Sequence, residues 1–368
     1  MDKNDIQKIN NDKSKESYDF DKIIDRSGSG DLKHEALLPR WRRNDLLPLW
    51  VADMDFETPM FITDALKKRL EHSLFGYTVE PKELWQSIIN WVKEHHQWEL
   101  RREWLKFIPG IVKGIGLVIN VYTKPGDKVI IQPPVYHPFR LTPEGNNREV
   151  VFNPLKLRDD GYYDMDFDNL EKVCDDKCRI FILCNPHNPG GICWSKETLQ
   201  KLADFCYDHH LLVISDEIHC DMAIFGHNHI PFATVSDKAR KNSITFQAPT
   251  KTFNIAGIIS SYAIIPNADI RKKFYGWINA NELDEANIFV EESSSGIGVI
   301  KRTSAHTPFI STLAAFESLH STNVINFFKK INILSGIEDS QFRDYTFDLI
   351  NKDSRSEERR VGKECLRL

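Results

Sequence analysis

Four short apolar runs constrain the fold of this chain more than any other feature of its sequence. They occupy residues 128–132, 179–184, 211–214 and 244–246. Continuous apolar strands that alternate with helices are typical of a mainly parallel sheet covered by helices on both faces. We therefore predict an α/β fold in which the carboxyl ends of these strands share one edge of the sheet.

Start signals and apolar spacing indicate the helices that would cover this sheet. Thr58 and Pro59 begin one predicted helix, and residues 83–95 form a second, amphipathic one. Ser195 is the predicted N-cap of a third, whose apolar face includes Leu199. With 368 residues, the chain is long enough for one large domain and a smaller one.

The segment at residues 46–56 precedes these helices. Its sequence, LLPLWVADMDF, predicts a strand followed by an irregular polar turn. Asp53 and Asp55 are conceivable metal ligands, but carboxylates in such a segment more often hold a turn, and we assign them that role.

Each of the four sheet strands is followed within a few residues by a side chain that can take part in chemistry. These side chains are Tyr136, Asn188, Asp216 and Lys251. Because the strand ends share one edge, a ring, an amide, a carboxylate and an amine are expected to converge where ligands of open α/β sheets bind. A partly desolvated amine there can form a Schiff base with a carbonyl, although most lysines simply lie on the surface.

A second candidate element is the glycine turn within residues 107–116, which joins a short strand to an apolar helix. The backbone N–H groups of Gly110, Ile111 and Val112 would form a phosphate cradle at the helix N-terminus, with the hydroxyl of Thr250 beside them. The spacing matches neither a Walker loop nor a dinucleotide fingerprint. A glycine needed only for helix packing is an equally good explanation.

An amine, a buried carboxylate, a flat ring and a phosphate cradle together suit pyridoxal 5'-phosphate (PLP). The segments that carry these residues, among them CNPHNPGGICW, SDEIHCDMAIFG and APTKTFNIAG, resemble the MalY/PatB group of fold-type-I PLP enzymes. The resemblance covers residues 18–289. It implies a large domain with a mainly parallel mixed sheet, flanked by helices, and a small domain that is incomplete here.

The resemblance also implies roles for single residues. Lys251 would be the Schiff-base lysine, Asp216 the partner of the pyridine nitrogen, Asn188 the amide beside the phenolate oxygen and Tyr136 the stacking ring. Thr250 stands where the family usually has serine, and His219 would support Asp216 or would merely pack against it. Such enzymes are homodimers, in which the tyrosine matching Tyr77 reaches the cofactor phosphate of the neighbouring subunit.

The function implied by the resemblance is a carbon–sulfur β-lyase. It would cleave a small amino-acid substrate, cystathionine or a related S-substituted cysteine, to pyruvate, ammonia and a thiol. An aminotransferase uses the same residues up to proton removal and is the alternative. A third possibility is a truncated protein of the PLP fold with little activity, because the family's Arg-Leu-Asn-x-Ala-x-Pro run, which supplies the arginine for the substrate carboxylate, is absent.

Composition limits the partners. A formal net charge of -5 offers no electrostatic basis for binding nucleic acid or an anionic membrane. Residues 1–17 are polar, unlike a signal peptide, so we expect a cytoplasmic protein. Six of the seven cysteines lie between Cys174 and Cys220 without a second pair at zinc spacing, so we expect reduced, mostly buried thiols.

The tail segment RSEERRVGKEC resembles the translation of a sequencing-adapter oligonucleotide, which predicts a chain truncated at its C-terminus. With this tail, five regions are expected along the chain. The regions are a disordered tail (1–17), an N-terminal arm contributing to the small domain (18–58), the large PLP-binding domain (59–289), an off-pattern segment with a remnant of the small domain (290–354), and a non-native tail (355–368).

Overall fold

The computed structural model describes residues 19–285, except residue 79, and residue 289. Its central feature is a seven-stranded sheet with the strand order β1-β9-β8-β7-β6-β2-β3. The strands are β1 (Leu105–Ile108), β2 (Lys128–Ile131), β3 (Glu149–Phe152), β6 (Cys178–Cys184), β7 (Leu212–Asp216), β8 (Ser243–Gln247) and β9 (Ser261–Ile264). A separate antiparallel pair is formed by β4 (Lys156–Leu157) and β5 (Tyr163–Asp164).

The four predicted strands are β2, β6, β7 and β8, and they are consecutive, parallel neighbours in the sheet. Their register aligns Cys184 with Asp216 and Asp216 with Phe246, so the carboxyl ends of β6, β7 and β8 lie side by side. Only β9 runs against its neighbours, β8 and β1. The prediction of a mainly parallel sheet is therefore confirmed.

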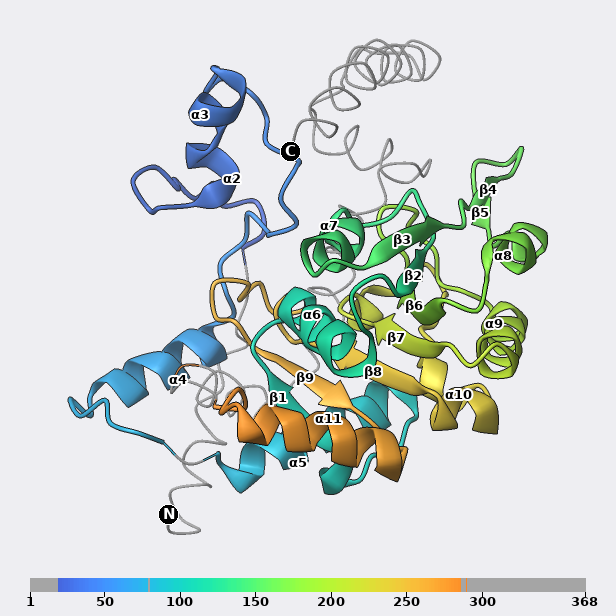
Figure 1. Ribbon diagram of the computed structural model, residues 1–368. Coiled ribbons are helices and arrows are strands. Elements are labelled where there is room, and N and C mark those ends of the chain that lie inside the picture. Colours follow the sequence, from blue (N-terminus) through green and yellow to red (C-terminus); the bar gives the residue numbers. More distant parts are fainter. Residues whose placement is uncertain (1–18, 79, 286–288, 290–368) are drawn as a thin grey trace. The chain divides into compact units, whose positions relative to one another are not determined.

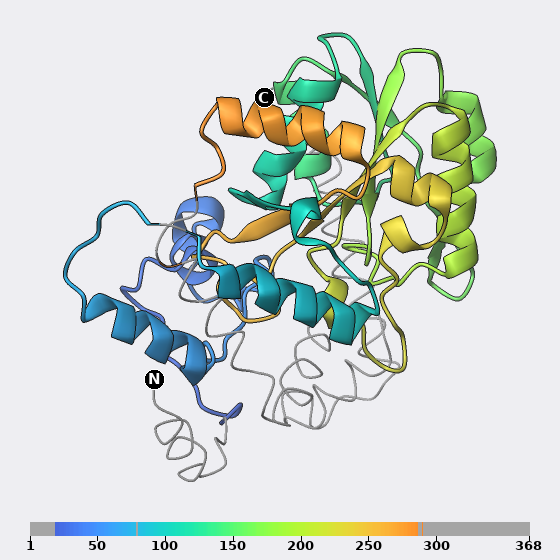
Figure 2. The same ribbon diagram turned by 90° about the horizontal axis from the view of Figure 1, so that it is seen from below.

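Helices cover both faces of the sheet (Figures 1 and 2). Ile180 and Ile182 of β6 pack in one apolar cluster with α6 and α11, whereas Phe181 and Leu183 pack in another with α8 and α9. This alternation follows from the two-residue period of a strand. The helices are α2 (Leu32–Glu35), α3 (Leu37–Trp41), α4 (Met60–Leu70), α5 (Lys82–His96), α6 (Ile111–Tyr122), α7 (Pro138–Gly145), α8 (Phe167–Val173), α9 (Lys196–Asp208), α10 (Asp237–Lys241) and α11 (Ala268–Ala280).

The three predicted helices form at the expected places. They are α4, which follows Pro59 as its N-cap, α5, and α9, whose N-cap Ser195 accepts a hydrogen bond from the Thr198 N–H. Short 3-10 turns, Arg102–Trp104 (η1), Cys220–Met222 (η2) and Phe232–Thr234 (η3), connect several of these elements. The helix predictions are confirmed, with boundaries displaced by one or two residues.

The strand predicted within residues 46–56 is wrong. No strand is assigned there, although this whole segment is described. Leu47 and Leu49 are 70% and 49% exposed, and Pro48 has no N–H to donate to a ladder. The segment is irregular, with bends at residues 50–51 and 55–56, and its backbone groups bind the Asn254 side chain instead of a neighbouring strand.

Helix α6 approaches the sheet so closely that Gly114 has no room for a side chain. A Cβ atom there would lie 2.7 Å from Ile108 Cγ2 and 3.0 Å from the Phe246 ring. We predict that Gly114→Ala lowers the free energy of unfolding by about 1–3 kcal/mol through overpacking. Gly276→Ala on α11 meets open space and should raise it by about 0.5–1 kcal/mol, since alanine is the better helix former. Urea denaturation of both variants tests this, and equal effects would contradict it.

The six cysteines in the described part of the chain are free thiols, and four of them are buried, as predicted. Within the same residues, no helix is long and apolar enough to cross a membrane. The predictions for residues 1–17, 290–354 and 355–368 fall outside the described residues. The boundary between the arm and the large domain at residues 58 and 59 stays a prediction.

Candidate active site

The edge formed by β2, β6, β7 and β8 brings the predicted site residues into one region. Tyr136 and Asn188 are in direct contact, because the Tyr136 N–H donates to the Asn188 carbonyl oxygen over 3.2 Å. Asp216 is the last residue of β7. The pKa of the Tyr136 hydroxyl is raised, first by partial burial of that ring and then by the charge of Asp216. The positive charge of Lys251 in turn acts to lower the pKa of Asp216. The register of β6, β7 and β8 aligns Cys184, Asp216 and Phe246, so the segments that follow these strands start side by side.

Asp216 is a buried carboxyl group, only 6% exposed. Burial raises its pKa to about 6, and this outweighs the hydrogen bond from the Ile218 N–H (3.1 Å) and the charges of His219 and Lys251, which act to lower it. A further cationic partner would stabilise the ionised form of this carboxyl group, because it would compensate for the lost hydration. The ring nitrogen of a protonated pyridine is a partner of this kind.

Lys251 lies in the turn at residues 249–257, which follows β8. Its Nζ atom donates a hydrogen bond to the Ala52 carbonyl oxygen over 2.6 Å, so the amine is directed by residues of the N-terminal arm. Thr250, the predicted phosphate ligand beside it, is largely buried. His219 is buried too and contacts the Met222 sulfur through Nδ1 at 3.5 Å. The positive charge of a protonated His219 acts to lower the pKa of Asp216.

The predicted phosphate cradle is only partly available. Gly110 precedes α6 with a φ angle of 106°, a backbone conformation that favours glycine. Its N–H, however, already donates to Ile108 O (2.8 Å) and Ser261 Oγ (3.0 Å), so a role as phosphate donor is not supported for this residue. Ile111 and Val112 lie in the first turn of α6, which has no side-chain cap and whose N–H groups have no acceptor within the helix.

Tyr77 lies in the connection between α4 and α5 and is fully exposed, at 101%. It belongs to none of the contacts that join the other candidate residues. A role toward a neighbouring subunit therefore stays a prediction.

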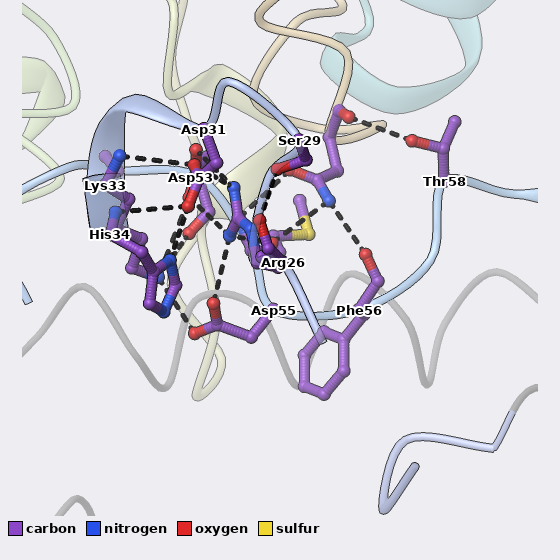
Figure 3. Close-up of polar contacts among 12 residues, drawn as sticks. Arg26, Ser29, Asp31, Lys33, His34, Asp53, Asp55, Phe56 and Thr58 are labelled. Carbon is purple, nitrogen blue, oxygen red and sulfur yellow. Dashed lines mark hydrogen bonds and ion pairs between the residues drawn. The ribbon is translucent and has the colours of Figure 1, made fainter. Parts of the chain in front are cut away.

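The Ala52 region is fixed by ion pairs of the N-terminal arm (Figure 3). Arg26 donates to Asp53 Oδ1 (3.1 Å) and to Asp55 Oδ1 (3.0 Å), while Lys33 Nζ contacts Asp55 Oδ2 (2.8 Å) and the Asp53 carbonyl (3.0 Å). Asp53 and Asp55 thus hold the segment in place, which agrees with the structural role predicted for them.

Comparison with known proteins shows the family of this chain. The family model for aminotransferase class I and II matches residues 44–285. The chain belongs to this family. It is 44% identical over 271 residues to cystathionine beta-lyase PatB of Bacillus subtilis, an alignment covering 73% of this chain and 70% of the relative. Protein MalY of Escherichia coli is 34% identical over 259 residues, covering 70% of this chain and 65% of the relative.

Two solved structures are similar to the chain as well. Cystalysin from Treponema denticola, whose crystal structure contains a pyridoxal 5'-phosphate cofactor, matches with a TM-score of 0.73 and 35% identity over 77% of this chain and 72% of that chain. The PLP-bound C-S lyase from Staphylococcus hominis matches with a TM-score of 0.72 and 31% identity over 85% and 78%. The predicted MalY/PatB resemblance and the PLP-enzyme fold are confirmed.

The sequence did not reveal the buried polar residues that surround the site. Asp221, in η2, is joined by hydrogen bonds to His96 at the end of α5 and to Thr252 in the turn that carries Lys251. Among the described residues, His96, Cys220 and Asp221 are the one group of metal-ligating side chains close enough to share an ion. Hydrogen bonds already occupy both carboxylate oxygens of Asp221, which explains this group without a metal. The only available signal was the position of Asp221, five residues after Asp216.

Proposed function

We propose that this chain is a PLP-dependent carbon–sulfur β-lyase that cleaves cystathionine or a related S-substituted cysteine to pyruvate, ammonia and a thiol. The observation that carries the proposal is the position of a buried Asp216 at the end of β7 and of Lys251 in the turn after the neighbouring strand β8, at the same carboxyl edge of the sheet. Similarity to proteins named cystathionine beta-lyase and C-S lyase supports the same reaction.

The donor set fits the coenzyme. Asp216 would hold the pyridine nitrogen, Tyr136 would lie against the ring, Asn188 would donate to the phenolate oxygen, and Ile111, Val112 and Thr250 would hold the phosphate. When bound, PLP supplies an electron sink for the charge left at Cα after proton loss. The raised pKa of Asp216 supports this fit, because a buried acid without a cationic partner is costly.

The remaining chemistry belongs to the protein's own side chains. Lys251 in its amine form takes the proton from the substrate Cα and holds it at Nζ, as a general base. The Ala52 carbonyl oxygen orients this amine through the 2.6 Å hydrogen bond. Asp216 would remain an anion and would hold the ring nitrogen. The β-thiolate then leaves with the bonding electrons of the carbon–sulfur bond, while the electron pair at Cα forms a carbon–carbon double bond. Hydrolysis of the released enamine by water gives pyruvate and ammonia.

The assembly and location proposed for the protein go with this function. We propose a homodimer in which Tyr77, fully exposed here, contacts the coenzyme phosphate of the partner subunit. A cytoplasmic location is proposed as well, for a protein that acts on a small amino acid.

A single assay separates lyase from aminotransferase. Incubated with PLP and L-cystathionine, and with no 2-oxo acid added, the chain should release pyruvate and ammonia in equal amounts. Pyruvate is measured with lactate dehydrogenase and ammonia with glutamate dehydrogenase, in separate samples. Turnover only after addition of a 2-oxo acid would favour the aminotransferase. Bound coenzyme without turnover of any amino acid would favour the alternative of a PLP-fold protein with little activity.

A further inference from the structure

The turn that carries Lys251 is tied to the protein interior by the next residue. Thr252 is 1% exposed, and its Oγ1 donates to Asp221 Oδ2 over 2.7 Å. Thirty-one positions separate the two residues in the chain. The contact therefore fixes the backbone directly after Lys251 to a distant element, the 3-10 turn η2.

Asp221 is itself held rigidly. Its Oδ1 atom accepts hydrogen bonds from Trp91 Nε1 (3.0 Å) and His96 Nε2 (2.8 Å), both on α5. Burial alone would raise the pKa of Asp221, but the hydrogen bonds of His96, Thr252 and Trp91 hold it at about 2. The group is therefore a buried carboxylate with three donors, and such charge-assisted bonds are stronger and more directional than neutral ones.

The other end of the same turn is held as well. Asn254 has a left-handed backbone conformation, with φ of 54°, and its Oδ1 accepts from the Met54 N–H over 3.0 Å. Its Nδ2 donates to Phe56 O over 2.9 Å. Lys251 thus lies between two anchored residues, one bound to Asp221 in the interior and one bound to the N-terminal arm. The Asn254 side chain and the Lys251 amine both bind backbone groups of the N-terminal arm. The hydrogen bond between Thr252 and Asp221 involves no residue of that arm.

We propose that Asp221 is a positioning residue for Lys251, and that it acts through the Thr252 hydroxyl to hold the amine in its working direction. The proposal rests on the proposed function for the role of the amine. A general base that is displaced by about 1 Å can lose on the order of 100-fold in rate, so a fixed turn has a direct catalytic consequence.

Thr252→Val tests the proposal, because valine has the shape of threonine without the hydroxyl. In the full chain, we expect kcat to fall by about 10- to 100-fold with KM changed by less than about twofold. The pH titration of the visible absorbance of bound PLP should shift its midpoint, and PLP release into an apoprotein acceptor should become faster. Thr252→Ser keeps the hydroxyl and should restore all three properties to nearly the values of the unaltered chain.

Thr123→Val is the matched structural control. Thr123 is also buried and its hydroxyl contacts Arg148 Nε at 2.7 Å, but it lies at the C-terminal end of α6, away from the site. This variant should lower the melting temperature and leave the PLP titration unchanged. Should Thr252→Val lower only the melting temperature, with titration, release and kcat unaltered, the proposal is overturned.

Two further outcomes need their own criteria: a Thr252→Val variant that does not fold, and an unaltered chain without lyase activity. If Thr252→Val does not fold, Thr252→Ala decides the matter by the same criteria, since a cavity of about 40 Å³ lined by Asp221, Ala248 and Pro249 can admit water to the carboxylate. If the unaltered chain binds PLP but releases no pyruvate, the proposed function fails. In that case, the midpoint of the PLP titration and the rate of PLP release still test the role of Asp221, because neither requires turnover.

Discussion

Replacing Lys251 by arginine should abolish pyruvate release from L-cystathionine, with kcat/KM at least about 10⁴-fold lower. The guanidinium group keeps the positive charge that faces Asp216 but does not lose its proton near neutral pH, so it can serve neither as nucleophile nor as base. Intact mass after borohydride reduction provides a second measurement. The unaltered chain should retain the mass of the coenzyme, and the variant should not.

Lys272→Ala provides the control for this experiment. Lys272 is an exposed lysine on α11, and its removal should change neither activity nor the reduced mass. Substantial lyase activity in Lys251→Arg would show that another group performs the chemistry, and the account of the site would then be wrong.

Asp216→Asn should have opposite effects on activity and on stability. Loss of the anion opposite the ring nitrogen should lower kcat on the order of 100-fold or more. In the coenzyme-free protein, the same change removes a buried acid whose pKa is raised from 3.8 to about 6. The free energy of unfolding at pH 7.5 should therefore rise, by up to about 3 kcal/mol.

The pH dependence gives this stability prediction a definite sign. Between pH 4 and 6 the folded chain binds a proton at Asp216 that the unfolded chain has already lost. The contribution of Asp216 to stability is therefore favourable below this range and is lost as the pH rises through about 6. The advantage of Asp216→Asn over the unaltered chain should be largest above pH 6 and should shrink toward pH 4.

Urea denaturation of both coenzyme-free proteins at pH 4.5 and 7.5 measures this difference. Asp176→Asn, an exposed position before β6, is the matched control and should show no such dependence. A constant difference between Asp216→Asn and the unaltered chain at both pH values would contradict the raised pKa.

The sheet and its functional edge were predictable because their signals are local. Continuous apolar runs specify buried parallel strands, and the residues after them must lie at the same edge, whatever the packing of the helices. That reasoning placed Tyr136, Asn188, Asp216 and Lys251 correctly at the ends of four neighbouring strands. The helix starts at Pro59 and Ser195 were equally readable, since capping depends on a few adjacent residues.

Predictions failed where the outcome depended on partners far away in the chain. The segment at residues 46–56 has strand-like composition, yet its backbone binds Asn254 about 200 residues later. Gly110 has the expected turn geometry, but Ser261 takes up the N–H that had been assigned to phosphate.

The amino-acid sequence by itself determined the α/β fold, the family and the set of groups available for chemistry. Apolar runs, helix caps and motifs each depend on residues that are neighbours in the chain. The tertiary structure alone decided which of those groups are charged, held or already bonded. Asp216 has a raised pKa because it is buried, while Asp221, five residues on and buried as well, remains ionised because three donors from α5 and the Lys251 turn meet it. Burial and hydrogen bonding over long sequence distances exist only once the chain has folded.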